Sequence, residues 1–128
     1  MTVDWDRLKL HARDASAKAY APYSNFKVGA AGLVNGEFVV EGCNIESASY
    51  GLTLCAECSM ISDVYRVGEG PLTHVVVVNS RGEVLMPCGR CRQLLWEHGG
   101  PSMLLMTPSG PKPMSEVLPD AFDASDLG

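Results

Sequence analysis

Four consecutive valines, in the segment HVVVVN at residues 74–79, restrict the fold of this chain more than any other feature. Alternate side chains of a strand point to opposite faces of its sheet, so a strand that is apolar at every position suits burial on both faces. The run therefore predicts a strand in a sheet that is covered on both sides.

The first part of the chain predicts one helix and two strands. Asp4 is a suitable N-cap for a helix through about Tyr20, with an apolar stripe that includes Leu8 and Ala12. FKVGAAGLV (residues 26–34) and EFVVEGCN (residues 37–44) read as strands joined by a two-residue turn at Asn35-Gly36.

The rest of the chain continues the alternation. We expect a helix over about 54–67 with Thr53 as its cap, a helix over about 89–98, a strand over 102–107 and a short helix over about 115–118. The short segment Val84 to Met86 can extend the edge of the sheet. The element order and the absence of a long linker predict one α/β domain, residues 1–128, with a mixed sheet.

Composition and charge set limits on the partners. With 128 residues, 46% of them hydrophobic, the chain can build its own core and needs no metal merely to fold. The net charge is −5, and the ten Lys and Arg residues form no run that could follow phosphates, which argues against a nucleic-acid partner. No apolar run reaches the roughly 20 residues of a membrane span, and the start lacks a signal-peptide pattern, so we expect a cytoplasmic location and no membrane partner.

Four of the five cysteines form two pairs with C-x-x-C spacing, Cys55/Cys58 and Cys88/Cys91. Without an export signal, clustered thiols suggest metal binding or catalysis before disulfides. Each pair falls where a loop enters the first turn of a predicted helix, where exposed N–H groups stabilise thiolates. The fifth, Cys43, is expected to be a small buried apolar residue.

Two kinds of zinc site fit these pairs. A closed structural site would use all four cysteines, whereas a catalytic site would use three and keep one position open. The second interpretation gives a role to Glu57, which lies between the cysteines of the first pair. Helical spacing puts Glu57 about 200° from Cys55, so spacing alone leaves the choice open unless Cys55 lies in the entry turn.

Longer segments carry a resemblance to a known family. CAE and PCGRC, together with YAPYSNFKVGAA, GCNIESASYGLTLCAE, MPCGRCRQLL and LPDAFDASDL in this order, resemble the zinc-dependent cytidine deaminases of the small homotetrameric type. The resemblance covers nearly the whole chain. It implies a three-layer cytidine-deaminase-like fold, with a mixed sheet of about five strands flanked by helices.

The resemblance also implies the chemistry. Cys55, Cys88 and Cys91 would bind one Zn²⁺ per subunit, and Glu57 would move protons between an activated water, ring N3 and the departing amine. The reaction would convert cytidine or deoxycytidine to the uridine product with release of ammonia. The alternatives are a structural zinc module and a deaminase for modified nucleosides, free bases, nucleotides or single-stranded nucleic acid, of which the last is disfavoured by the lack of a basic patch.

The substrate contacts follow from the same resemblance. The family pattern assigns the ribose to Asn44 and Glu46, the pyrimidine ring to Phe26 and its polar edge to the backbone of Ala56. Tyr50 and Phe122 match aromatic residues near an intersubunit contact, and Phe122 would reach the site of a neighbouring subunit in a homotetramer. Without the resemblance, the same residues would be read as turn, core or tail positions.

One position departs from the family. Close relatives carry arginine directly after Cys-Ala-Glu, where this chain has Cys58. Three thiolates on Zn²⁺ leave a net charge of −1, so positive charge must come from elsewhere. We expect Arg90 and Arg92 to supply it, with Arg90 hydrogen-bonded to the zinc thiolates. The alternatives are that Arg90 is a solvated helix residue and that Cys58 is an occasional fourth ligand.

Overall fold

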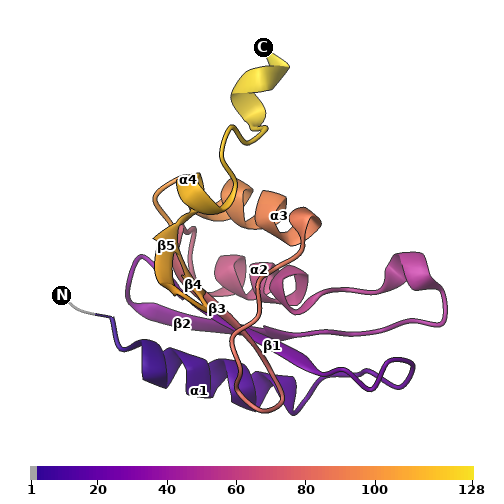
Figure 1. Ribbon diagram of the computed structural model, residues 1–128. Coiled ribbons are helices and arrows are strands. Elements are labelled where there is room, and N and C mark those ends of the chain that lie inside the picture. Colours follow the sequence, from indigo (N-terminus) through magenta and orange to yellow (C-terminus); the bar gives the residue numbers. More distant parts are fainter. Residues whose placement is uncertain (1–2) are drawn as a thin grey trace.

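The computed structural model describes residues 3–128 and contains a five-stranded sheet with helices on both faces (Figure 1). In chain order the elements are α1 (Trp5–Ser16), β1 (Val28–Val34), β2 (Phe38–Cys43), η1 (Tyr50–Leu52), α2 (Ala56–Val67), β3 (Leu72–Asn79), α3 (Gly89–Gly99), β4 (Leu104–Thr107), β5 (Gly110–Pro113), α4 (Met114–Val117) and η2 (Ala124–Leu127).

The sheet is mixed, as predicted. Its strand order is β2-β1-β3-β4-β5; β3 and β4 run parallel, and all other neighbours are antiparallel. β1 and β2 form the expected hairpin, in which Asn35 and Gly36 have φ of 55° and 68°. Two successive positive φ values are typical of the turn that best matches the twist of a hairpin.

The valine run lies in the middle strand and is buried on both sides, which confirms the prediction. Val75 and Val77 belong to the core cluster under α2, α3 and α4, whereas Val76 and Val78 pack with residues of α1. Figure 1 shows the resulting three layers, with α1 alone on one face and α2 and α3 on the other.

Two helices begin or end at positions other than those predicted. α1 ends at Ser16 and not near Tyr20, because the backbone of Tyr20 pairs with Asn44 and Glu46 instead of continuing the helix. The cap of α2 is Cys55, not Thr53, whose hydroxyl accepts a hydrogen bond from the Ser47 N–H at 3.1 Å.

The strands differ from the predictions mainly at the sheet edges. The segment Val84 to Met86 extends the pairing of β3 at its first two residues: Val84 is bridged to Val78, and the Leu85 N–H donates to the Val77 carbonyl at 2.8 Å. The fifth strand is β5, an edge strand whose sequence GPKP reads as a turn. An edge strand tolerates proline because one side of its backbone has no strand to pair with.

A close contact between β2 and α2 fixes the position of the first turn of α2, which follows Cys55. A Cβ added at Gly42 would lie 2.5 Å from the carbonyl oxygen of Ala56 and 2.4 Å from the Met60 nitrogen, so only glycine permits this approach. The first turn of α2 therefore rests directly on β2.

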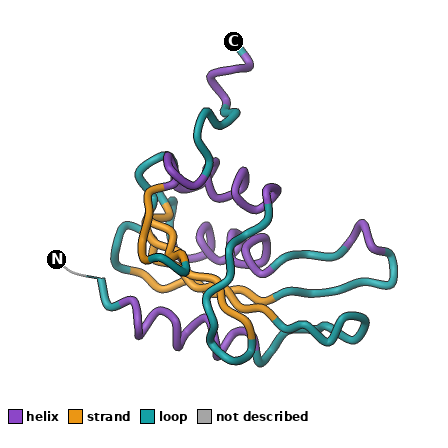
Figure 2. Tube along the Cα trace, in the orientation of Figure 1, coloured by secondary structure: helices purple, strands orange, loops and turns teal. Residues whose placement is uncertain are grey.

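Three parts of the chain extend beyond the layered body. Figure 2 shows two long loops at one side, which correspond to residues around 20–26 and 44–54, and a tail that ends in η2. No helix within residues 3–128 is both long and apolar enough to cross a membrane.

Candidate active site

The N-termini of α2 and α3 bring three cysteines together. Cys55 and Cys88 are the N-cap residues of the two helices, and Cys91 lies in the first turn of α3. Their sulfur atoms all lie within 4.8 Å of one another. Three thiols at this spacing, from two helix N-termini, form a group that can hold one metal ion.

Cys58 lies outside this group although its position in α2 corresponds to that of Cys91 in α3. It lines a separate hollow of about 280 Å³ together with Arg90, Gln93, Leu94 and Glu97. The sulfur cluster is therefore formed from three of the four paired cysteines.

Glu57 reaches the thiol group because Cys55 is still in extended backbone. Cys55 has φ −68° and ψ 160°, so the helix begins only at Ala56 and the 200° offset of a regular helix does not apply. Glu57 is 4% exposed and lines a hollow of about 250 Å³ with the three cysteines. Burial raises the pKa of its carboxyl group, and contact with Cys91 partly opposes that shift.

The thiols have unequal pKa values in the protein without metal. Burial raises the pKa of Cys55 and of Cys91, and Glu57 raises that of Cys91 further. The pKa of Cys88 is lowered, chiefly by the Cys91 backbone N–H. A divalent cation would favour all three thiolates, and a thiolate donor set suits Zn²⁺ over Mg²⁺ or Ca²⁺.

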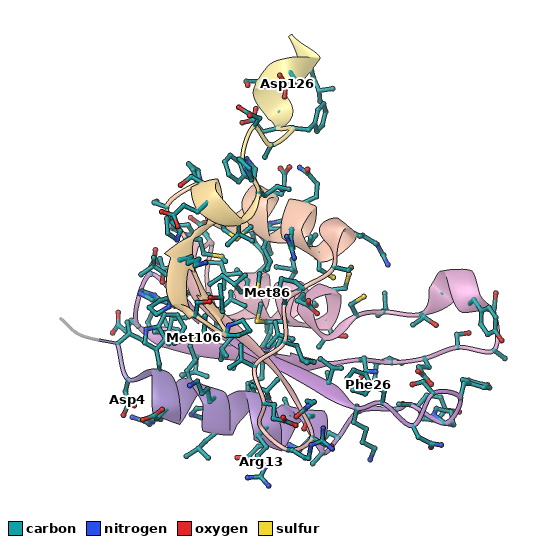
Figure 3. All side chains as sticks on the ribbon, viewed as in Figure 1. Asp4, Arg13, Phe26, Met86, Met106 and Asp126 are labelled. Carbon is teal, nitrogen blue, oxygen red and sulfur yellow. The ribbon has the colours of Figure 1, made fainter. Side chains whose placement is uncertain are left out.

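Three of the predicted substrate residues line the same hollow: Phe26, Asn44 and Ala56. Phe26 is half-exposed at its rim and is labelled in Figure 3 beside the projecting loops. The Asn44 carboxamide accepts a hydrogen bond from the Val28 N–H at 2.8 Å and donates to the Phe26 carbonyl at 2.9 Å. The start of β1 is thereby fixed against the end of β2.

Glu46 and Tyr50 lie elsewhere, in a separate hollow of about 260 Å³ that Tyr23 and Ser24 also line. The Glu46 carboxylate accepts hydrogen bonds from the N–H groups of Tyr23 and Ser24, at 2.9 and 3.1 Å, and from the Ser24 hydroxyl. The hydroxyl contact lowers the pKa of Glu46 below its ordinary value. Within one chain, Glu46 thus holds the loop that leads to Phe26.

Phe122 lies in the tail, where its side chain is 55% exposed. The Gln93 amide donates a hydrogen bond of 2.7 Å to its carbonyl oxygen, which ties the start of the tail to α3. Figure 1 shows the following segment, with η2, standing clear of the body.

The two predicted arginines have different surroundings. Arg92 Nε donates to the Pro87 carbonyl at 2.8 Å and Nη1 to that of Val117 at 3.5 Å, so its guanidinium braces the loop before Cys88. The Arg90 side chain is exposed beside Cys58 and makes no hydrogen bond to a cysteine within residues 3–128, whereas its backbone N–H helps to lower the pKa of Cys88.

The hollow that Glu57 and the three thiols line has further residues in its walls that were not predicted from the sequence: Val28, Thr53, Leu54, Val77, Leu85, Met86 and Pro87. Most are apolar and flank the two cysteine motifs or lie in the strands below them. Their proximity to CAE and PCGRC along the chain is the signal that could have identified Leu54 and Met86.

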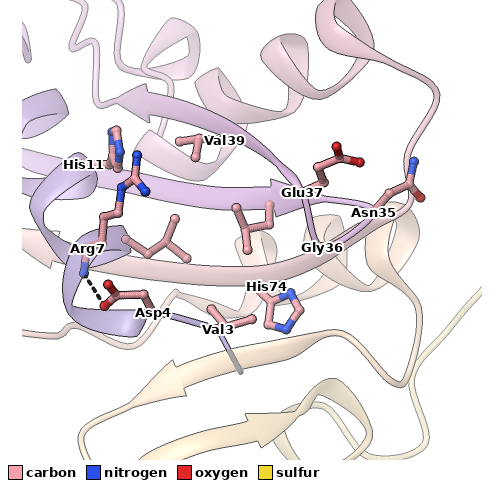
Figure 4. Close-up of a pocket in the computed structure, with 11 residues that line it drawn as sticks. Val3, Asp4, Arg7, His11, Asn35, Gly36, Glu37, Val39 and His74 are labelled. Atoms are coloured by element: carbon pink, nitrogen blue, oxygen red, sulfur yellow. Dashed lines mark hydrogen bonds between the residues drawn. The ribbon is translucent and has the colours of Figure 1, made fainter. Parts of the chain in front are cut away.

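Another hollow, of about 400 Å³, lies on the opposite face of the sheet. Figure 4 shows Arg7 and His11 of α1 on one side of it, with Val39 and His74 among its other labelled residues. It contains none of the cysteines and is unrelated to the thiol group.

A three-layer fold with a mixed sheet, three thiols at two helix N-termini and a buried carboxyl group beside them defines a zinc-dependent deaminase. The chain belongs to this class: residues 4–107 match the family described as the cytidine and deoxycytidylate deaminase zinc-binding region.

Individual relatives agree in sequence and structure. The chain is 52% identical over 125 residues to a cytidine deaminase of Mycobacterium tuberculosis, covering 98% of this chain and 94% of that protein. A crystal structure of cytidine deaminase from the same organism has a TM-score of 0.92, with 52% identity and coverage of 95% of this chain and 99% of the other. For the Mycobacterium leprae enzyme the TM-score is 0.90, at 56% identity and with 93% and 100% covered.

Proposed function

We propose that this protein is a hydrolase that deaminates cytidine and 2'-deoxycytidine, giving uridine or 2'-deoxyuridine and ammonia. The observation that carries the proposal is the buried Glu57 carboxyl group facing the same hollow as Cys55, Cys88 and Cys91. A purely structural zinc site has no use for a buried carboxyl group or for an adjacent hollow lined by an aromatic residue and an amide.

Zinc would be held by Cys55, Cys88 and Cys91, one ion per subunit. Three protein ligands leave one tetrahedral position open, and the bound ion supplies Lewis-acid activation of a water molecule. We infer that the positive charge of Arg90 and Arg92, both in the first turn of α3, offsets the three thiolates. Arg92 would act from its bridge to the Pro87 carbonyl.

Glu57 would carry the protons. The raised pKa of Glu57 lies closer to neutral pH, and a group with such a pKa can both accept and donate a proton. In the proposed reaction it takes a proton from the attacking water and delivers it to ring N3, and it then takes the proton of the new C4 hydroxyl group and delivers it to the departing amine. Water adds at C4 of the pyrimidine and the bond from C4 to the exocyclic amine breaks, so the products are the uridine nucleoside and ammonia.

The nucleoside would lie between Phe26 and the start of α2. Phe26 would pack on the pyrimidine ring, and the Ala56 backbone would contact the polar edge of the base. Asn44 keeps one amide hydrogen and one lone pair beyond its two backbone contacts, which suits a ribose hydroxyl. We also assign Glu46 and Tyr50 to the side of the site where the ribose would lie. Glu46 would act there by holding the loop that leads to Phe26.

We also propose a homotetramer in which Phe122 completes the site of a neighbouring subunit. The exposed Phe122 ring, on a tail anchored to α3 but otherwise clear of the body, supports this arrangement. The three thiol ligands require a reducing environment, which supports a cytoplasmic location.

The direct test is to incubate zinc-loaded protein with cytidine and to follow uridine formation and ammonia release. Equal amounts of both products would support the proposal. Zinc-loaded protein that turns over neither cytidine nor deoxycytidine would instead favour a structural zinc module.

A further inference from the structure

A second hollow adjoins the catalytic one. It has a volume of about 290 Å³ and lies where the β4–β5 turn and α4 meet the first turn of α3. Met86 lines both hollows, and Figure 3 labels this side chain near the middle of the molecule. Apart from Met86, none of the residues assigned above to the hollow of the three thiols lines this one.

Two cationic side chains converge on the second hollow. Lys112 comes from the exposed strand β5 and Arg92 from α3. Neither makes a salt bridge with a carboxylate within residues 3–128. In a chain of net charge −5, two unpaired cations from separate elements that face one hollow suit an anion.

The Arg92 guanidinium is held in a fixed orientation. Its Nε and Nη1 groups donate to the carbonyls of Pro87 and Val117, while its Nη2 group makes no hydrogen bond within the described chain. A guanidinium that is already oriented loses little entropy when it binds an oxyanion.

The turn between β4 and β5 adds a neutral donor. The Thr107 hydroxyl donates to the Gly110 carbonyl at 2.7 Å and accepts from the Ser109 N–H at 3.1 Å, which fixes the turn. The exposed hydroxyl of Ser109 lines the hollow and has no hydrogen-bond partner in residues 3–128. Glu116 is the one carboxylate in the lining, and it opposes the two cations.

We propose that this hollow binds a phosphate-class oxyanion, with Lys112 and Arg92 as charged donors and Ser109 as the neutral donor. Lys112, Arg92 and Glu116 together carry a net charge of +1. A dianion is favoured over a monoanion because its attraction to this net charge is twice as large. The anion can be inorganic phosphate or the phosphate group of a small organic monoester, since both present the same oxygens.

The site would communicate with the metal loop through Arg92. This residue follows Cys91 directly and holds the carbonyl of Pro87, which precedes Cys88. An anion on Nη2 would therefore perturb the backbone from Pro87 to Arg92. This consequence concerns the loop itself and does not depend on the proposed reaction.

The test is a titration of the zinc-loaded protein with inorganic phosphate, followed by amide NMR at constant ionic strength, since salt screens exposed charges. We expect saturable shifts at Ser109, Lys112 and the loop from Pro87 to Arg92. A parallel titration with glycerol phosphate distinguishes the sources: similar affinity indicates a phosphate group in general, and weaker binding indicates free phosphate.

Three variants make the test specific. Lys112→Met should weaken binding at least about tenfold, because charge-assisted hydrogen bonds are among the strongest. Glu116→Gln should tighten binding several-fold by removing the opposing charge. Lys18→Met, the same change at an exposed lysine outside the hollow, should leave affinity unchanged. Shifts that do not saturate, or equal losses for the Lys112 and Lys18 variants, would overturn the proposal.

Discussion

Glu57 and Cys91 come from different helices, yet they line one hollow and each changes the pKa of the other. The contact exists because the first turns of α2 and α3 point at the same space. A carboxyl group beside a metal thiol is the arrangement that a proton-transfer role at the metal requires.

Replacing Glu57 with glutamine should strongly reduce turnover while zinc and fold are retained. Glutamine has nearly the same shape but cannot carry a proton, so we expect a loss of turnover of about 10²- to 10⁴-fold. Measured zinc content and the circular dichroism spectrum show whether the variant keeps its metal and its fold. Glu69→Gln, at an exposed position outside the site, is the matched control and should keep full activity. Full activity in the Glu57 variant would remove the residue from the mechanism.

The two cysteines of the CAEC segment should respond differently to the same change. Cys58 lies outside the sulfur cluster, so Cys58→Ser should leave one zinc per chain and nearly normal turnover. Cys55→Ser removes a ligand and should weaken zinc binding by more than the roughly 10- to 100-fold typical of outer contacts. Zinc loss in the Cys58 variant would point to a four-cysteine site.

The sequence predicted the fold well where local patterns determined it. The valine run, the Asn35-Gly36 turn and both cysteine-bearing helices were predicted at nearly their observed positions. Strand β5 was missed because Gly-Pro-Lys-Pro has turn composition, and only the neighbouring β4 makes it a strand. The end of α1 was missed because the backbone of Tyr20 pairs with a segment more than twenty residues away.

The arginines of α3 provide a test of charge at the site. Removing Arg90 takes away positive charge near the thiolates, so Arg90→Ala should raise the pH at which turnover sets in, by up to about one unit given its exposure. Zinc affinity should fall in parallel. Unchanged zinc content together with an unchanged pH profile would show that Arg90 is a solvated helix residue.

Glu46 should control the order of the loop before Phe26. Glu46→Gln replaces a charged acceptor by a neutral one, so the N–H groups of Tyr23 and Ser24 should exchange with solvent faster. Because the folded protein lowers the pKa of Glu46, this stabilisation is fully present above the ordinary pKa of 4.5 and is lost as the pH falls through the lowered pKa of the folded protein.

Hydrogen exchange at pH 7 and pH 3.5 checks this prediction. The wild-type loop should lose protection at the lower pH, and the Glu46 variant should show little change between the two conditions. Glu37→Gln, at an exposed turn position, serves as the control. Equal protection in the wild type and the Glu46 variant at pH 7 would contradict the assigned role.

Phe122 should act in trans if sites are shared between subunits. Phe122→Ala should weaken cytidine binding, and mixed assemblies of the Phe122→Ala and Glu57→Gln chains should recover activity. In such assemblies an intact Phe122 from one chain can complete a site that contains an intact Glu57 from the other. A mixture no more active than its separate components would place Phe122 outside the neighbouring site.

The substrate contacts were the least accessible part of the site from sequence. Phe26, Asn44 and Ala56 line the hollow of the three thiols, whereas Glu46 turns its carboxylate to its own chain's loop. A carboxylate in a loop can bind a ligand or the backbone, and the three-dimensional path of residues 20–26 decides between them.

Stepwise addition of zinc to metal-free protein, with cytidine turnover measured at each step, tests whether the three thiols form the catalytic site. We expect uridine and ammonia to appear in equal amounts, and turnover to rise in proportion to bound zinc up to one ion per chain. Glu57→Gln should bind the same zinc with strongly reduced turnover. Protein that is fully loaded with zinc and still leaves cytidine and deoxycytidine unchanged would show that the site of the three thiols is not that of a cytidine deaminase.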